Sequence, residues 1–155
     1  MSDVFDPEVF MNQTIDSPMS IDWELPPEGY FQAMVDDFDT SEKFFRRGSS
    51  DKGPWVIFNC PFSILDPAVL AKLGRDKVVV RGGWFLEFDG AALSTDKSKN
   101  VMIGRLRNAL GQNSGTWGLP MLKGAGPVMV QVKHRADKND PEKKYAEVVN
   151  VAPVR

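Results

Sequence analysis

The sequence predicts a mainly β domain in which five strands enclose one hydrophobic core, and three observations support this prediction. Segments in which every second residue is apolar recur between residues 29 and 151, as expected for strands that bury one face. Glycines, prolines and polar stretches separate these segments, which is typical of turns. Finally, 155 residues that are 42% hydrophobic and 26% charged fit one globular domain of ordinary composition.

Five segments are expected to form strands: residues 29–36, 55–60, 77–88, 128–135 and 145–151. The third is the most informative. Its even-numbered positions, from Val78 to Phe88, are expected to face the core, and its odd-numbered positions, which include Arg81 and Phe85, are expected to face solvent. The polar, basic stretch between the first two segments is expected to be a loop.

Two further segments are expected to be helical. Residues 66–74 begin with Asp66 as the N-cap and Pro67 in the first turn, and they end at Gly74. Residues 100–111 place five apolar residues on one stripe. This helix falls between the third and fourth strands, which is the element order of the OB-fold, a five-stranded, partly open Greek-key barrel. We therefore assign residues 29–155 to an OB-fold domain, with a small β-sandwich as the alternative.

The charges divide the chain into two parts. Residues 1–42 hold 11 acidic side chains and no lysine or arginine, while residues 43–155 hold 10 acidic and all 19 basic side chains. The formal net charge of −2 therefore combines −11 in the first part with +9 in the second. Residues 1–28 lack strand alternation and are predicted to be an acidic N-terminal arm, in which Asp6 and Pro7 start a short helical turn. The asymmetry predicts a polyanion-binding body, although the two parts could instead neutralise each other across the fold.

An OB-fold binds its ligand on the face of strands 2 and 3. The loop between strands 1 and 2 and the loop between strands 4 and 5 also take part, and basic and aromatic residues of this sequence fall in these places. Proteins that bind single strands combine cations for the phosphates with aromatic rings on which bases stack. The predicted nucleic-acid-binding residues are Phe44, Arg46, Arg47, Lys52, Trp55, Arg81, Phe85, Lys133, Arg135, Lys143, Lys144 and Tyr145. The alternative is that Phe44 and Trp55 belong to the core and that the basic residues only keep the turns soluble.

The sequence offers little for catalysis. One cysteine, Cys60, excludes a disulfide framework within the chain and a multi-cysteine zinc site, and we expect it to be a buried thiol. The only histidine, His134, is expected to pack at the end of a strand. The acidic cluster Asp36, Asp37 and Asp39 is expected to be a solvated strand end. We therefore expect a non-catalytic protein with no metal and no cofactor.

Neither a membrane span nor a secretory leader is expected. No apolar run approaches the roughly 20 residues that cross a bilayer, and the first residues lack a basic and apolar leader. Together with the single cysteine, these features favour a reducing compartment.

Five short stretches, spread over nearly the whole chain, carry a family resemblance. They are Phe5-Asp6-Pro7-Glu8, Pro27-Glu28-Gly29-Tyr30, Leu73-Gly74-Arg75, residues 100–111 and Val132-Lys133-His134-Arg135. In these stretches the chain resembles the small single-stranded-DNA-binding proteins of bacteriophage replication and recombination modules. The resemblance implies an OB-fold, sequence-tolerant binding of single strands, and a place in the host cytoplasm. Proteins of this type often end in an acidic tail that recruits partners, whereas here the acidic excess lies at the start of the chain.

These observations predict a non-catalytic protein that binds single-stranded DNA and works with replication or recombination proteins. The alternative, from another class, is a phage or host-takeover interaction module that holds a peptide or protein partner on the same barrel. A nuclease would need carboxylates in a metal-ligand pattern, which the sequence does not present. The sequence leaves open whether copies associate into a homo-oligomer, the size of the binding site, a preference for DNA or RNA, and whether the arm competes with nucleic acid or contacts a partner.

Overall fold

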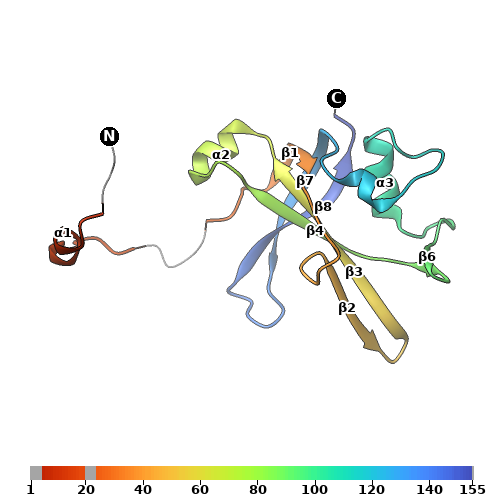
Figure 1. The fold of residues 1–155 in the computed structure, drawn as a ribbon, viewed down its shortest axis with the longest axis horizontal. Helices are drawn as coiled ribbons and strands as arrows, with labels where there is room; N and C mark the ends of the chain where they lie inside the picture. Colours follow the sequence, from red (N-terminus) through yellow and green to blue (C-terminus); the bar gives the residue numbers. More distant parts are fainter. Residues whose placement is uncertain (1–4, 20–23, 155) are drawn as a thin grey trace.

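The computed structural model describes residues 5–19 and 24–154. In these ranges the chain is mainly β, and Figure 1 shows how the strands wrap around a common centre. The elements in chain order are α1 (Pro7–Asn12), β1 (Gly29–Val35), β2 (Phe45–Ser50), β3 (Gly53–Ile64), α2 (Pro67–Leu73), β4 (Val79–Phe85), β5 (Phe88–Asp89), β6 (Ala92–Leu93), α3 (Val101–Ala109), a 3₁₀ helix (Leu119–Leu122), β7 (Val128–Ala136) and β8 (Lys144–Ala152).

The main sheet closes into a ring. Its strand order is β1-β7-β8-β4-β3-β2, and β1 also pairs with β3, so β1, β7, β8, β4 and β3 form a closed circuit that we call the barrel. The pairings are antiparallel except that of β4 with β8, where Arg81 pairs with Glu147. The long strand β3 pairs first with β2 and then with β1, so the β2–β3 hairpin extends beyond the ring (Figure 1). The prediction of a mainly β, barrel-like fold is confirmed, and the closure favours a barrel over a β-sandwich.

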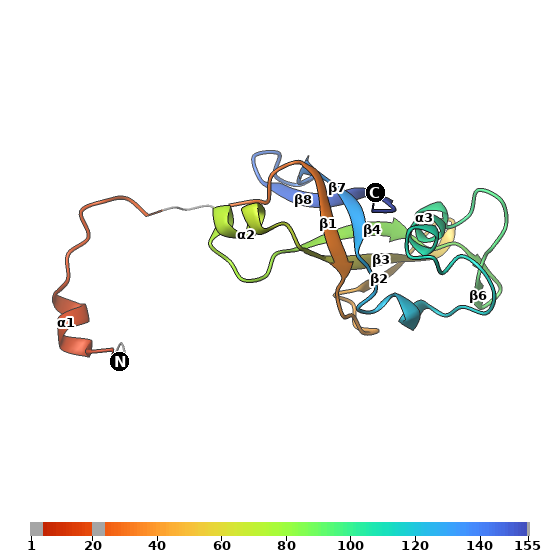
Figure 2. The ribbon, with the colours of Figure 1, turned by 90° about the horizontal axis from the view of Figure 1, so that it is seen from above.

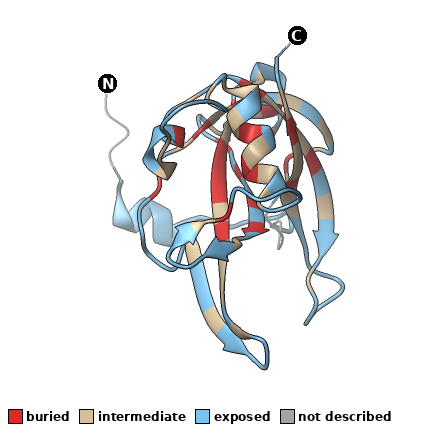
Figure 3. Ribbon diagram, turned by 90° about the vertical axis from the view of Figure 1, so that its right-hand side faces the viewer, coloured by how far each residue is buried: buried red, intermediate tan, exposed pale blue. Residues whose placement is uncertain are grey.

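The core lies inside this ring, and Figure 3 shows the buried positions gathered there. It contains Phe58, Cys60 and Phe62 of β3 and three valines of β7, with Leu106 of α3 packed against them. Strand β4 alternates between exposed and buried residues as predicted, with Val80, Gly82 and Trp84 inside. At Gly82 a Cβ would lie 3.0 Å from the carbonyl oxygen of Val148, so glycine allows β4 and β8 to approach closely.

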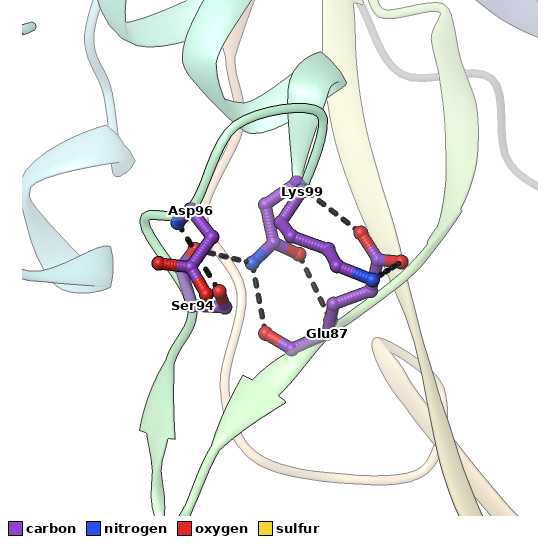
Figure 4. A network of polar contacts seen from close by, with 5 residues as sticks. Glu87, Ser94, Asp96 and Lys99 are labelled. Carbon is purple, nitrogen blue, oxygen red and sulfur yellow. Dashed lines mark hydrogen bonds and ion pairs between the residues drawn. The ribbon is translucent and has the colours of Figure 1, made fainter.

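The strand predicted at residues 77–88 is shorter in the structure, and the prediction of an inward-facing Phe88 is wrong. Strand β4 ends at Phe85, and Phe88 begins the small β5–β6 hairpin, where 48% of its surface is exposed. Asn100 fixes this turn in place, within a network of polar contacts in which Figure 4 labels Glu87 and Ser94. Its side chain accepts a hydrogen bond from the backbone N–H of Glu87 (2.9 Å) and donates to the carbonyl oxygens of Glu87 (2.8 Å) and Ser94 (2.9 Å). The chain therefore leaves the barrel at the point where the alternation would have continued.

The basic stretch predicted as a loop contains strand β2, so this prediction is also wrong. Residues 45–50 pair with residues 53–58 in an antiparallel hairpin. Much of β2 is exposed, because it projects from the ring and pairs with β3 alone. A strand that exposes residues on both faces has no need for alternating apolar residues, which explains why its sequence gives no strand signal.

The two predicted helices of the body are present. Helix α2 has Asp66 as its N-cap, with a 2.9 Å hydrogen bond from the N–H of Ala68, and it ends at Gly74 in the left-handed conformation. Helix α3 buries Ile103 and Leu106 against the core. None of the helices in the described ranges is long and apolar enough to cross a membrane.

The described residues of the arm behave in two different ways. The predicted helical turn is present as α1, where Asp6 accepts a 3.0 Å hydrogen bond from the N–H of Glu8 and Pro7 occupies the first position. Helix α1 buries none of its residues and lies apart from the barrel (Figures 1 and 2). Residues 24–28, in contrast, are attached to the barrel.

That attachment uses hydrogen bonds to both backbone and side chains of the arm. Arg75 donates to the carbonyl oxygen of Glu24 (2.7 Å), and the N–H of His134 donates to the carboxylate of Glu28 (2.9 Å). The Nε2 atom of His134 lies 2.6 Å from the carbonyl oxygen of Pro26, so Nε2 carries the proton and donates. His134 thus sits near the end of β7, as expected, but its role there is to hold the arm.

Candidate nucleic-acid interface

The candidate interface is the outer surface of β2, β3 and β4, which we call the outer face. Arg46 of β2 pairs with Ile57 of β3, and Ile57 pairs with Phe85 of β4, so these three side chains form a row across the sheet on one face. Trp55 and Arg81 lie on the same face, two residues before Ile57 and four residues before Phe85. The strand alternation therefore brings two predicted cations and two predicted stacking residues together.

Two aromatic rings lie side by side on the outer face, toward the end near the β2–β3 turn. Phe85 is 65% exposed, and its ring centroid lies 6.3 Å from that of Trp55, with an angle of 70° between the ring planes. Trp55 is half-buried, because its indole lies across Gly48 of the neighbouring strand. The two rings thus expose differently oriented surfaces side by side, and both are available to planar ligands.

Phe44 links the outer face to the core. Its centroid lies 6.4 Å from that of Phe38, a buried residue, while the guanidinium carbon of Arg81 lies 6.0 Å and the Lys43 ammonium 5.4 Å from the centroid of Phe44. The backbone fixes it there, since Asn59 donates its N–H to the Phe44 carbonyl oxygen (2.7 Å). Phe44 therefore packs against the core, as in the alternative considered for it, and two cations lie over its ring at the edge of the outer face.

Arg47 and Lys52 are not part of the outer face. Arg47 pairs with Val56, so it points to the side of β2 opposite to that of Arg46, and it donates a hydrogen bond to the carbonyl oxygen of Thr40. Lys52 is exposed in the turn of the β2–β3 hairpin. The two positive charges lie at the margin of the candidate interface.

A second basic group lies on β7 and β8, which follow β4 around the ring. Lys133 pairs with Glu147, Arg135 pairs with Tyr145, and these four side chains share the outward side. The Nε atom of Arg135 lies 3.1 Å from a carboxylate oxygen of Glu147. Lys143 and Lys144 are exposed where the loop enters β8. The predicted cations of this region are thus close together, with one carboxylate among them.

Sequence reasoning missed that carboxylate and the role of Gly48. Glu147 pairs with Arg81 on one side and with Lys133 on the other, which places a negative charge between the two basic groups. Its position two residues after Tyr145, with the same strand parity, is the signal that could have identified it. Gly48 carries no sequence signal, because its importance depends on the ring of Trp55.

The acidic cluster expected at the end of β1 is divided among different partners. Asp36 lies 2.9 Å from Lys77, Asp37 lies 4.0 Å from Lys123, and Asp39 accepts a 2.9 Å hydrogen bond from the N–H of Ser41. Burial acts to raise the pKa of Asp36, but the hydrogen bonds from Lys77 and from the Asp37 backbone and the nearby lysine charges outweigh it and lower this pKa. These pairs neutralise part of the acidic excess of residues 1–42 against the body.

The rest of the described chain offers no metal-binding cluster. Across residues 5–19 and 24–154, no three histidine, cysteine, aspartate or glutamate side chains gather in a way that could hold an ion. Cys60 is fully buried on β3, and this burial raises the pKa of its thiol. The prediction of a buried cysteine is confirmed.

The sequence matches no protein-family model and no curated protein.

Proposed function

We propose that this protein is a non-catalytic binder of single-stranded DNA built on an OB-fold. The order of the ring strands supports the fold assignment, since β1, β3, β4, β7 and β8 would be its five strands and α3 falls between the third and fourth of them. The outer face would then lie on strands 2 and 3 of the fold, the surface on which OB-folds bind oligonucleotides. Strand β2 would be an addition in the loop between strands 1 and 2.

The observation that carries the proposal is the pair of neighbouring aromatic rings, Trp55 and Phe85, with Arg46 in the same row across the sheet as Phe85 and Arg81 four residues before Phe85 on β4. A base that stacks on an exposed ring contributes about 1–3 kcal/mol, and every base has a face that can stack. Cations on either side of the rings would hold the phosphates that connect two stacked bases. Such a surface binds unpaired strands without reading their sequence, whereas the bases of a duplex are already stacked on one another.

The cations define a path for the strand. From Arg46 the path crosses Trp55 and Phe85, and it reaches the side of Arg81 and Lys43 near Phe44. Lys133 and Arg135 would continue it across β8 on longer strands, past Glu147. Binding that depends on phosphate contacts releases counterions and weakens as salt rises.

The biological setting is proposed from the sequence resemblance alone. We place the activity in bacteriophage DNA replication or recombination, in the host cytoplasm, together with replication or recombination proteins. The alternative of an interaction module that holds a peptide on the same face makes an opposite prediction, because a peptide-binding surface would not prefer single strands over duplex.

Fluorescence anisotropy with a labelled oligo-dT and a duplex of the same length tests the proposal, at about 50 and 200 mM salt. We expect tight binding of the single strand that weakens with salt, and much weaker binding of the duplex. Phe85→Ala should weaken binding, and Phe88→Ala is the matched control, because it removes an exposed phenylalanine outside the outer face. Absence of single-strand binding at low salt, or equal loss in both variants, contradicts the proposal.

A further inference from the structure

The largest feature that the proposed function leaves unexplained is the apolar surface of the arm. Residues 5–19 expose six large apolar side chains, although the sequence around them is acidic. They are Phe5, Val9, Phe10, Met11, Ile15 and Met19. Helix α1 contributes no buried residue, and Figure 2 shows it well away from the barrel. Exposed apolar groups in such density mark a surface that another surface covers.

We propose that residues 5–19 of one copy of this chain lie in an apolar groove on the barrel of a second copy. The groove has a volume of about 890 Å³ and lies between β1, the connection from β3 to α2, and the end of β8. Tyr30, Leu65, Met129 and Pro153 line it. Tyr30 is 59% and Leu65 is 41% exposed, so apolar surface on the groove is uncovered just as it is on the arm.

The arm leaves the barrel beside this groove. Glu28, which His134 holds, directly precedes β1, and residues Tyr30 and Gln32 of β1 line the groove. Arg75, which follows α2, holds Glu24 on the same side of the molecule. An arm that starts at the edge of a groove and points away from its own barrel has the geometry of a reciprocal exchange, in which two copies each insert an arm into the other.

The charge of Arg105, beside the groove, is opposite in sign to that of the arm. The arm carries Asp6, Glu8 and Asp16. At the groove, Arg105 of α3 is exposed and lies 3.2 Å from the side-chain oxygen of Asn150, a lining residue. Asp66 also lines the groove, but it accepts the N-cap hydrogen bond of α2. Arg105 would therefore meet the carboxylates of the inserted arm.

The area is sufficient for a stable pair. A fully buried phenylalanine covers about 150–250 Å², and Phe5 and Phe10 still expose 65% and 57% of their surface, so the two phenylalanines of each of two arms, with the groove surface that they cover, supply a large part of the roughly 1,200 Å² at which specific interfaces begin. The remaining four apolar side chains of each arm add to this area.

Sedimentation over a wide range of protein concentration tests the proposal on the full-length chain, with three variants. Val9→Ser with Phe10→Ser removes two of the exposed apolar side chains of α1, Leu65→Asp charges the groove, and Phe88→Asp is the control, because it charges an exposed phenylalanine outside both surfaces. We expect the unaltered chain and the control to form dimers as concentration rises. The arm variant and the groove variant should remain monomeric, with unchanged circular dichroism.

A mixing experiment then establishes that the contact joins two copies. The arm variant keeps an intact groove and the groove variant keeps an intact arm, so a mixture of the two should form heterodimers although neither associates alone. Tyr30→Asp serves as a second groove variant should Leu65→Asp disturb α2. Oligonucleotide binding plays no part in this readout, so it separates the inference from the proposed function.

Three results overturn the proposal. The first would be that the unaltered chain sediments as a monomer at every concentration. This outcome includes an arm that folds onto its own barrel. The second would be that the unaltered chain dimerises and the arm variant dimerises equally well, which would place the interface elsewhere. The third would be that the arm variant and the groove variant fail to associate when mixed, which would assign their individual defects to other causes.

Discussion

The indole of Trp55 lies across Gly48 on the neighbouring strand, so closely that a Cβ at residue 48 would be 2.3 Å from Cζ2 of the ring. Glycine is therefore required at this position for space, and not for an unusual backbone angle. It makes room for the large indole of Trp55, which remains partly exposed. The orientation of Trp55, on which the proposed base stacking depends, is set by a residue that would not contact the DNA.

Gly48→Val should displace the indole and weaken single-strand binding several-fold, because a base would no longer find the ring in position. The loss should appear in oligo-dT anisotropy, and tryptophan fluorescence should report the changed surroundings of the ring. Gly104→Ala is the matched control, because no atom lies within 4 Å of a Cβ at that helix position. It should leave binding unchanged and stabilise the protein by about 0.5–1 kcal/mol. Full binding by Gly48→Val would remove Trp55 from the interface.

Trp55→Ala and Phe85→Ala should each weaken oligo-dT binding about 5- to 150-fold, which corresponds to about 1–3 kcal/mol per stacked base. Their rings lie 6.3 Å apart, so a single strand that stacks on both must couple them. The double variant should therefore lose less than the sum of the two single losses, since the first substitution already releases part of the strand. Additive losses would indicate two independent contacts, and no loss in either variant would rule out the outer face.

The sequence predicts a structural feature when the residues that determine it lie within one element, and it fails when they are distant in the chain. Alternation identified the inner side of β4, and capping residues identified α1 and α2, because these signals arise within one element. Strand β2 was missed, since a strand that pairs on one edge and exposes residues on both faces need not alternate. Phe88 was misplaced because Asn100, 12 residues later in the chain, fastens the turn that ends the alternation.

The same contrast between local and distant information applies to the candidate interface. Arg81 and Phe85 could be selected from sequence, because their strand positions and residue types are local information, whereas Arg46 was selected by residue type alone. The direction of Arg47 could not be predicted, since it depends on the unrecognised β2 and its register with β3. The role of Gly48 and the place of Glu147 between two basic groups arise only when strands that are distant in sequence come together.

Glu147→Gln should tighten oligonucleotide binding, because it removes the negative charge between Arg81 and the pair Lys133 and Arg135. It also frees Arg135 from its ion pair, so the affinity should fall more steeply with salt. The stability should change by no more than about 1 kcal/mol, as for other solvent-accessible ion pairs. Asp89→Asn in the β5–β6 hairpin is the control for a general change in net charge. Equal affinities for Glu147→Gln and the unaltered protein would exclude a path across β8.

The attachment of the arm should weaken in acid. The backbone N–H of His134 holds the pKa of the Glu28 carboxyl below its ordinary value of 4.5. A carboxyl with a lowered pKa in the folded state stabilises that state fully above the ordinary pKa, and this contribution is lost as the pH falls through the lowered pKa. Denaturation followed from pH 6 downwards should therefore show a smaller acid-induced loss of stability in Glu28→Gln than in the unaltered protein. Identical pH profiles would show that this hydrogen bond does not contribute.

Cys60 provides a built-in measure of both folding and ligand binding. Its side chain is fully buried on β3, and burial raises the pKa of the thiol, so a thiol reagent can react only when the barrel opens. The reaction should therefore be slow in the native protein and fast in denaturant. A ligand that binds only the folded chain stabilises it by about 2.7 kcal/mol at 100 times its Kd, and should slow labelling about 100-fold. Oligo-dT should have this effect and a duplex at the same concentration should not; equal labelling rates with and without oligo-dT would contradict single-strand binding by the folded barrel.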